Sequence, residues 1–427
     1  MKILIIGAGG VGNSLAKILA TRSFYDSVIV SDFDLSRAHG VLEWIEAKHP
    51  GQRPRFQADH VDASSVDQVS ALARKHGATL VMNAVEPSFV ESIFNGAFAA
   101  GADYMDMAMS LSSPHPTDPH NTPGVMLGQW QFDQSANWEA AGRLALVGMG
   151  VEPGISDVFA RYASDHLFSE IDEIGVRDGA NLVVTDEQGN EIFAPSFSIW
   201  TTIEECLNPP LVYEKDRGWF TTAPFSEPEV FHFPAGIGPV ECVNVEHEEV
   251  VLVPRHIDAK RVTFKYGLGE EFIGVLRTLN LLGLDATTPV TVRSAPDDSG
   301  QRGKVSVSPR DMVAAVLPDP ATLGESMTGT TCAGVWVTGT GLDGKPREVY
   351  LYHALDNAWS MEHFDAQCVV WQTALAPAVA LELLATGVWS GAGVIGPEGF
   401  DAKPFLELMA APESEGGYGQ AWGLEER

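Results

Sequence analysis

Three glycines near the N-terminus have the spacing that lets a peptide backbone approach a pyrophosphate. Gly7, Gly9 and Gly12 form the pattern G-x-G-x-x-G. Gly7 permits a tight turn, Gly9 has no Cβ to keep phosphates away, and Gly12 lets a helix lie close to a strand. The free N–H groups at the positive end of that helix would face the phosphates. The expected dinucleotide contacts in this segment are Gly7, Gly9, Gly10, Val11 and Gly12.

A carboxylate stands where the ribose of such a cofactor would lie. Asp32 follows the apolar run 27–31, about 20 residues after the last glycine. Its side chain would accept hydrogen bonds from the ribose hydroxyls and would repel a 2′-phosphate, which predicts NAD(H). NADP(H) stays open as the alternative, because Ser31 and Arg37 lie close by and an arginine can accommodate the phosphate.

A strand, a turn and a helix must hold these residues in place, and the sequence supplies them in that order. The apolar run 1–6 has the length of a buried parallel strand, and residues 13–20 have the pattern of a helix. Strand and helix patterns then alternate up to residue 150. Such alternation is typical of a parallel sheet covered by helices, so an α/β dinucleotide-binding domain is expected.

Two loops of this domain carry further residues that would meet the cofactor. The strand 78–84 ends near Asn83, and ligands bind at the carboxyl ends of parallel strands. We therefore expect Asn83, Ala84 and Val85 along the ribose or the nicotinamide. Asp62 follows a strand at 55–62, in the loop that passes the adenine in such folds. Asp62 or Ser64 could also cap the helix that follows, and the two roles are compatible.

Four side chains at strand ends have the chemistry of acid–base catalysis. Tyr104 and Asp106 are two apart in the strand 103–108, so they face the same side of it. Glu152 and Asp157 flank a Pro-Gly turn that ends the last strand of the first half. Structural roles are open alternatives, because Asp106 could bond backbone groups and Glu152 could supply the negative charge that favours a helix start.

Composition narrows the class of protein. A formal net charge of −30 argues against a nucleic-acid partner. The four cysteines are scattered, so neither a zinc site nor a disulfide framework is indicated, and His115 and His120 lack companion ligands for a metal. The N-terminus enters a strand at once, and no apolar run is expected to cross a membrane. These features predict a cytoplasmic protein.

The second half of the chain has a different pattern. Residues 170–360 group several strands with a few helices, which predicts an α+β domain on a mixed or antiparallel sheet. A helical pattern returns from Phe364. The expected organisation is a Rossmann domain at 1–154, an α+β substrate-binding and dimerisation domain at 155–363, C-terminal helices at 364–412 that return to the Rossmann domain, and a fraying tail at 413–427.

Motifs along nearly the whole chain occur in the order found in one known family. The segments 6–12, 101–106 and 150–157 are similar to its glycine turn, its G-x-x-Y-x-D segment and its G-x-x-P-G turn. The segments 225–229, 237–242 and 393–398 are similar to its S-E-P-E, G-P-V-E and G-V-x-x-P-E signatures. The chain thus resembles the saccharopine dehydrogenase family, although its loop at 111–128 is longer and Ala374 stands where the family often has glycine.

The resemblance implies an NAD(P)-dependent oxidoreductase that transfers hydride at a C–N bond of an amino-acid or polyamine-derived secondary amine, of the saccharopine or carboxyspermidine type. Such an enzyme needs an acid or base near nitrogen. Asp106 is the first candidate, followed by Tyr104 and Glu152. A homodimer is also implied. The expected substrate contacts are Asp157, Trp200, Thr201, Glu241 and His247, with Arg177 and Lys265 as candidates for a substrate carboxylate.

Two alternatives remain open at this point. Oxidative deamination of a free amino acid such as lysine would not need the additional Arg or Lys that a second carboxylate-bearing arm requires. A non-catalytic dinucleotide-sensing protein would bind the cofactor without turnover. A tryptophan such as Trp200 more often belongs to a core than to a site, and His247 could belong to a solvated acidic run with its glutamate neighbours.

Overall fold

A parallel sheet organises the N-terminal half of the protein. The computed structural model describes residues 1–296 and 300–427. The strands of this sheet are β1 (Lys2–Ile6), β2 (Ser27–Asp32), β3 (Phe56–His60), β4 (Leu80–Asn83), β5 (Asp103–Met105), β6 (Leu144–Leu146) and β19 (Gly393–Ile395). Their order is β19-β6-β5-β4-β1-β2-β3, and every neighbouring pair is parallel.

The register of this sheet brings the predicted cofactor residues to one edge. Ile6 pairs with Ser31 on β2 and with Asn83 on β4. The glycine turn after β1, Asp32 at the end of β2 and Ala84 after β4 therefore lie side by side at the carboxyl ends of the strands, where α/β sheets bind ligands.

Helices cover this sheet. They are α1 (Gly10–Leu19), α2 (Leu35–Lys48), α3 (Val66–His76), α4 (Val90–Ala100), α5 (Gln129–Asp133) and α6 (Ser135–Ala140). Two of them, α2 and α3, have side-chain N-caps. The cap of α3 is Ser65, whose hydroxyl accepts from the Gln68 N–H. The expectation of a cap at Asp62 or Ser64 is therefore wrong, because the Asp62 carboxylate accepts from the N–H and the hydroxyl of Ser64 in the turn before the helix.

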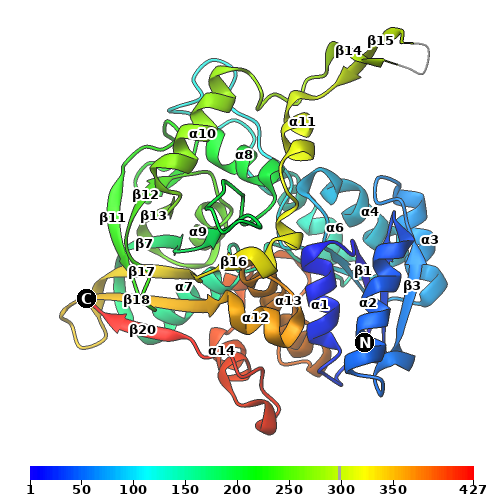
Figure 1. Ribbon diagram of the computed structural model, residues 1–427. Coiled ribbons are helices and arrows are strands. Elements are labelled where there is room, and N and C mark those ends of the chain that lie inside the picture. The colour runs from blue at the N-terminus through cyan, green and yellow to red at the C-terminus, as the bar shows by residue number, and fades with distance from the viewer. Residues whose placement is uncertain (297–299) are drawn as a thin grey trace.

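A nine-stranded mixed sheet forms the second domain (Figure 1). Its strands are β7 (Phe168–Ala180), β9 (Leu211–Glu214), β10 (Gly218–Thr221), β11 (Glu229–Phe233), β12 (Gly238–Asn244), β13 (Ala259–Tyr266), β17 (Thr330–Gly341), β18 (Pro346–Asp356) and β20 (Gly423–Glu426). The β7–β13 pair is parallel and the other pairs are antiparallel.

The remaining helices belong to the second domain and to the C-terminal segment. They are α7 (Ile155–His166), α8 (Ile199–Leu207), α9 (Glu249–His256), α10 (Gly269–Leu281), α11 (Pro309–Val316), α12 (Asn357–Phe364), α13 (Cys368–Thr386) and α14 (Ala402–Ala410). A short ladder pairs β8 (Val183–Val184) with β16 (Met327–Thr328).

The chain returns to its first domain at the C-terminal end. Helix α13 packs against α1 (Figure 1), and β19 adds a strand beside β6. The buried ammonium of Lys17 on α1 donates to the carbonyl oxygens of Phe364 and Asp365, at 2.9 and 3.0 Å. These contacts join the two ends of the chain, and the predicted α/β architecture with a mixed-sheet second domain is confirmed.

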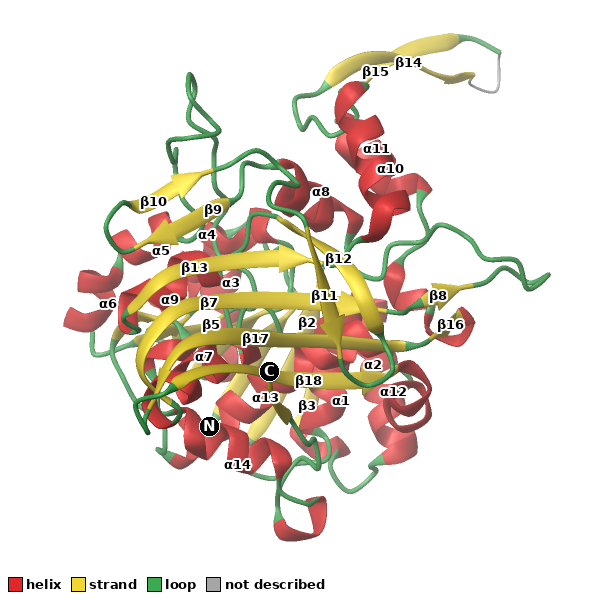
Figure 2. Cartoon of the chain, turned by 90° about the vertical axis from the view of Figure 1, so that its left-hand side faces the viewer, coloured by secondary structure: helices red, strands yellow, loops and turns green. Residues whose placement is uncertain are grey.

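A β-hairpin projects from the body of the protein. It consists of β14 (Val290–Pro296) and β15 (Arg302–Val307) and extends beyond α10 and α11 (Figure 2). We call residues 290–296 and 300–307 the arm.

Two expectations about the C-terminal part are wrong. The tail does not fray, because β20 pairs with β18 and Tyr418 is buried. An apolar stretch does have the length and composition to cross a membrane, since α13 meets both criteria. However, 78% of that stretch is buried inside the protein, as in a core helix.

Candidate active site

The glycine turn has the geometry that a pyrophosphate requires. Gly7 has a φ of +101°, and a Cβ there would lie 2.6 Å from the carbonyl oxygen of Ala84. A Cβ on Gly12 would lie 1.9 Å from the carbonyl oxygen of Gly7. A Cβ on Gly9 would meet nothing within 4 Å, so it would fill the open space in front of the turn. The turn therefore fits a dinucleotide, with Gly7 and Gly12 needed for the fold and Gly9 left for the ligand.

The ribose end of this site contains both of the predicted charged residues. Asp32 accepts from the N–H of Ala8 at 2.7 Å and from the N–H of Asp34 at 2.8 Å. These bonds tie the acid to the glycine turn. Arg37 is exposed and lines a cavity of about 330 Å³ together with Gly9, Gly10 and Asn13. A carboxylate and a guanidinium thus flank the place where the ribose would lie.

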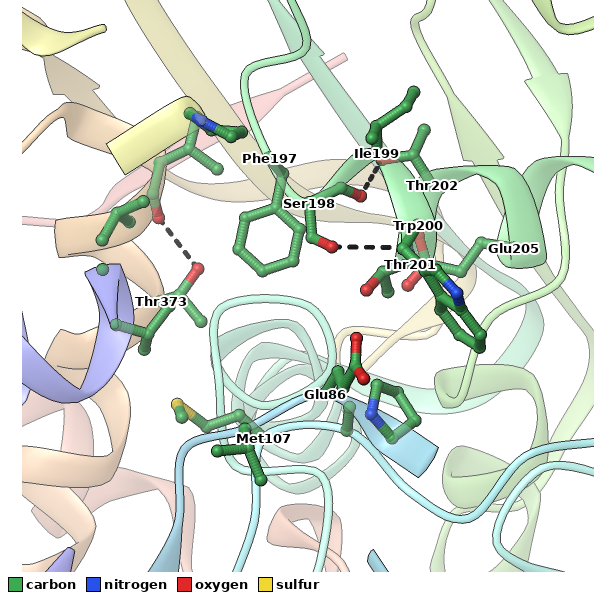
Figure 3. A pocket seen from close by; sticks show the side chains of 18 of the residues that line it. Glu86, Met107, Phe197, Ser198, Ile199, Trp200, Thr201, Thr202, Glu205 and Thr373 are labelled. Carbon is green, nitrogen blue, oxygen red and sulfur yellow. Dashed lines mark hydrogen bonds between the residues drawn. The ribbon is translucent and has the colours of Figure 1, made fainter. Parts of the chain in front are cut away.

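A larger cavity, of about 680 Å³, begins at the glycine turn and extends toward the second domain. The first domain contributes Gly10, Val11, residues 83–87 and residues 106–108 to its wall. The second domain contributes the start of α8, and the C-terminal segment contributes Thr373 from α13 (Figure 3). The cavity therefore joins the expected nicotinamide end of the cofactor site to the second domain.

The wall of this cavity is strongly acidic. Among its described lining residues there is no Lys or Arg, and His247 is the one basic side chain. Its acidic residues are Glu86, Asp106, Glu152, Asp178, Glu205, Glu248, Asp311 and Asp319. Burial raises the pKa of Glu205 to about 8 and that of Asp106 to about 7. Burial, reinforced by the Asp178 charge, also raises the pKa of Glu152. A bound cation would stabilise the ionised form of these groups.

His247 is held in one orientation by its neighbours. Its Nδ1 lies 2.6 Å from Glu249 Oε2, and its ring stacks on Phe264 with centroids 3.9 Å apart and planes inclined by 7°. Glu249 in turn accepts from the Ser156 hydroxyl at 2.8 Å. Burial lowers the pKa of His247, but Glu249, Glu205 and Glu248 outweigh that effect and raise it to about 10. The imidazole is thus a positioned proton donor facing an acidic cavity.

The same cluster has the donor set of a cation site. One ligand atom from each of His247, Glu248 and Glu249 lies within 4.8 Å of the others, and all three residues are buried. The Nδ1 of His247 and an oxygen of Glu249 already bond each other, so an ion would have to replace that hydrogen bond.

Asp106 lines the cavity, but its oxygens are committed to the protein. Oδ1 accepts from the Gly148 N–H at 2.7 Å and Oδ2 accepts from Gln131 Nε2 at 2.8 Å. Tyr104 lies behind this wall, with no exposed surface, and its hydroxyl accepts from Asn83 Nδ2 at 3.0 Å. Asn83 then accepts from the Val85 N–H at 3.1 Å. Tyr104 therefore positions the loop after β4 and does not itself line the cavity.

Several other predicted substrate contacts lie outside the cavity. Asp157 accepts from the Gly154 N–H at the start of α7, and Glu241 is exposed on β12. Arg177 and Lys265 both pair with Glu229, at 2.5 and 2.7 Å. Their charges are thus satisfied away from the site, because the fold uses them to join strands of the second sheet.

The predicted residues that do line the cavity are Gly10, Val11, Asn83, Ala84, Val85, Asp106, Glu152, Trp200, Thr201 and His247. Sequence reasoning missed Glu86, Asp178, Glu205 and Glu248. Glu205 had a usable signal, because residues four apart on a helix share a face and it follows Thr201 by one turn. No signal in the sequence placed Asp178 in the site, because only the path of β7 through the fold brings it there.

Comparison with known proteins shows which family has this arrangement. Residues 3–146 match the saccharopine dehydrogenase NADP binding domain, and residues 150–412 match the saccharopine dehydrogenase C-terminal domain. The chain belongs to the saccharopine dehydrogenase family. As a member of this family it is an NAD(P)-dependent oxidoreductase, so the alternative of a non-catalytic sensor is set aside.

Relatives in this family match over almost the full chain. A carboxynorspermidine synthase of Vibrio alginolyticus is 30% identical over 412 residues, which cover 96% of this chain and 94% of that protein. A carboxyaminopropylagmatine dehydrogenase of Synechocystis is 28% identical over 413 residues, covering 96% and 95%. The apo saccharopine dehydrogenase of Saccharomyces cerevisiae has the same fold, with a TM-score of 0.67 at 12% identity, covering 100% of this chain and 99% of that one.

Proposed function

We propose that this family member acts on the C–N bond of a carboxylated polyamine, reducing an imine to a secondary amine or oxidising that amine in reverse. The observation that carries the proposal is the cavity wall, which has eight acidic residues and no Lys or Arg among those described. A polyamine carries several ammonium groups that such a wall would attract. A saccharopine-type substrate carries several carboxylates, which the same wall would repel. The names of the two bacterial relatives, carboxynorspermidine and carboxyaminopropylagmatine enzymes, also point to polyamines.

The proposed reaction divides between cofactor and protein. When bound, the nicotinamide would supply or accept the hydride at the imine carbon. Loop 83–85 and the glycine turn hold the cofactor against the cavity, and the acidic wall holds the ammonium groups of the substrate. The imine nitrogen gains one proton as the carbon gains the hydride, which yields the neutral secondary amine.

We assign that proton to His247, with Glu249 as the residue that positions it. The Glu249 bond occupies Nδ1, which leaves Nε2 to exchange a proton with the substrate nitrogen. Asp106, the first candidate from sequence, is the second choice, because its pKa of about 7 suits proton transfer but both oxygens bond the protein. Glu152 remains a further candidate as a wall residue, and Tyr104 takes a positioning role.

Cofactor preference follows from the two charged residues at the ribose end. We propose NAD(H) as the preferred cofactor, because the Asp32 carboxylate would repel a 2′-phosphate. Arg37 is the residue that such a phosphate would contact, so NADP(H) is the weaker alternative. Asp62, in the loop after β3, is proposed to lie near the adenine.

A substrate panel tests the proposed reaction. Initial rates would be measured with NAD⁺ and NADP⁺ on carboxynorspermidine, carboxyspermidine, saccharopine, lysine and ornithine. We expect the highest kcat/KM with a carboxylated polyamine and little turnover of saccharopine. Turnover of free lysine or ornithine alone would instead support the amino-acid deamination alternative, and a preference for saccharopine would contradict our interpretation of the acidic wall.

We further propose a homodimer in which the arm contacts the acidic surface of a second copy. Its strands carry Arg293, Arg302 and Lys304, and with Asp297 and Asp298 between them in the sequence, residues 290–307 have a formal charge of +1 on a chain with a net charge of −30. Light scattering during size-exclusion chromatography should give a dimer mass. The double variant Arg302→Glu, Lys304→Glu should shift it toward the monomer, whereas an unchanged mass would exclude the arm as the contact.

We also propose that the enzyme acts in the cytoplasm. All four cysteines, Cys206, Cys242, Cys332 and Cys368, are free and buried. Free thiols persist most readily in a reducing compartment. Fractionation of the native cells, with the enzyme followed by its activity, would test this location.

A further inference from the structure

The acidic cavity must also accept the carboxylate of the proposed substrate. A carboxylated polyamine brings a carboxylate into a wall of like charge, so that group needs a positive partner. Arg310 contacts α8, but it pairs with Glu204 and donates to the carbonyl of Asp285 at 2.7 Å. The guanidinium is thus already committed, and His247, the one basic side chain of the described wall, is assigned to the reacting nitrogen.

Helix N-termini are another source of positive potential, and those of α1, α8, α9 and α13 lie at this cavity. The start of α1 faces the expected pyrophosphate. At the start of α13, the N–H groups of Cys368 and Val369 already donate to Asn357 Oδ1 and Gln367 Oε1. At the start of α8, the N–H groups of Ile199 and Trp200 have no acceptor within residues 1–296 and 300–427, and both residues line the cavity. Helix α8 therefore offers free donors, and its first turn lacks the carboxylates of Glu248 and Glu249 that stand at the start of α9.

A buried hydroxyl lies beside those donors. Thr201 is 7% exposed and lines the cavity, and its hydroxyl has no hydrogen-bond partner in the described part of the chain. Its neighbour Thr202, in contrast, donates from its hydroxyl to the Ser198 carbonyl at 2.9 Å. The Thr201 hydroxyl is accessible from the cavity, so a bound ligand can accept its hydrogen bond.

A carboxylate lies one helical turn further along the same face. Glu205 lines the cavity on the same side as Thr201 (Figure 3). Residues four apart on a helix are neighbours, with Cβ atoms about 5–6 Å apart. The start of α8 thus presents N–H and hydroxyl donors next to an acceptor, and an α-amino acid presents a carboxylate next to an ammonium group.

We propose that the first turn of α8 is the subsite for the amino-acid head of the substrate. The carboxylate accepts from the N–H groups of Ile199 and Trp200 and from the Thr201 hydroxyl, while the adjacent ammonium group binds Glu205. This inference rests on the proposed function, since it assumes a polyamine that carries such a head. It explains how an acidic cavity accepts a carboxylate, and why a saccharopine-type substrate with carboxylates at other positions would be excluded.

Two variants separate the donors from the acceptor. Thr201→Val keeps the shape of the side chain and removes the hydroxyl, and Glu205→Gln removes the charge. The probes are carboxynorspermidine, measured by its KM for oxidation, and norspermidine, which lacks the carboxyl group, measured by its Ki as a competitive inhibitor. Thr386→Val, on α13 and outside the cavity, is the matched control, because its hydroxyl only bonds carbonyls of its own helix.

Each variant has its own expected signature. Thr201→Val should raise the KM for carboxynorspermidine roughly 10-fold, the scale of one hydrogen bond to a charged group, and leave the Ki of norspermidine within about twofold. Glu205→Gln should raise both constants, because both molecules carry ammonium groups. Thr386→Val should change neither.

The outcomes also separate this inference from the proposed function. If the wild-type enzyme oxidises no carboxylated polyamine, the proposed function fails and the subsite fails with it. If the wild-type enzyme is active but Thr201→Val changes both constants equally, or changes neither, the subsite assignment alone is overturned.

Discussion

The two ends of the active site recognise their ligands in different ways. At the pyrophosphate end, the backbone of one contiguous glycine turn would make the contact, and glycines are required there because side chains would collide or block the approach. At the substrate end, carboxylates from β7, α8, the loop before α9 and other distant segments meet in one cavity. The first kind of site depends on local shape, whereas the second depends on charge that the whole fold assembles.

The largest effect should come from a change confined to the substrate end. His247→Gln removes the proposed proton donor and should lower kcat by about 100-fold or more, the usual range for loss of a general acid or base. The dissociation constant of NADH, measured by fluorescence titration, should stay unchanged.

Glu249→Gln is the companion variant for a positioning role. It should lower kcat less than His247→Gln does. It should also move the limb of the pH–rate profile that reports His247 toward lower pH, because Glu249 orients His247 and raises its pKa. A rise in KM with unchanged kcat for both variants would show that His247 binds substrate and carries no proton.

Two glycine variants should distinguish the glycine that the fold requires from the glycine that leaves room for the cofactor. Gly12→Ala places a Cβ 1.9 Å from the Gly7 carbonyl oxygen, and such overpacking should destabilise the protein by about 1–3 kcal/mol or more. Gly9→Ala meets nothing within 4 Å, so its melting temperature should stay close to wild type. Its NADH dissociation constant should nevertheless rise roughly 10-fold through lost phosphate contacts.

The control for this pair is Gly274→Ala, in the interior of α10 with open space around it and away from the cofactor site. It should raise the stability by about 0.5–1 kcal/mol, because alanine is the better helix former, and leave cofactor binding unchanged. Equal effects of Gly9→Ala and Gly12→Ala on stability would remove the distinction between the two roles.

Asp32→Ala should have a smaller effect, which is a change in cofactor choice together with the loss of the acceptor for the Ala8 and Asp34 N–H groups. Removing the carboxylate should shift the ratio of kcat/KM for NADH over NADPH by roughly 10-fold toward NADPH. Arg37→Ala should move the same ratio in the opposite direction, because a 2′-phosphate would lose its cation. A wild-type enzyme that already uses NADPH far better than NADH would contradict the assigned role of Asp32.

These contrasts also explain what the sequence could predict. The glycine turn, the strand ends at Asn83 and the parallel sheet follow from local patterns, and the structure has them where they were expected. The acidic wall was harder to predict from the sequence. Asp178 and Glu205 come from distant segments, which meet only when the two domains pack together. Tyr104 and Asp157 had plausible chemistry, but burial behind the wall decides their roles, and burial is a property of the fold.

The smallest effect concerns the stability of the protein without substrate. The pKa of Glu205 is raised from 4.5 to about 8 by burial, so the folded state keeps a proton that the unfolded state loses in this range. Its contribution to stability is therefore fully present below pH 4.5 and is lost as the pH rises through about 8. Glu205→Gln should flatten this fall in melting temperature, whereas Glu139→Gln, at an exposed position on α6, should leave it unchanged. Carboxynorspermidine should stabilise the wild-type protein more at pH 9 than at pH 5, because its ammonium groups compensate the ionised wall. Equal stabilisation at both values would show that the charge of the cavity does not contribute to binding, and the contrast between the two ends of the site would then rest on shape alone.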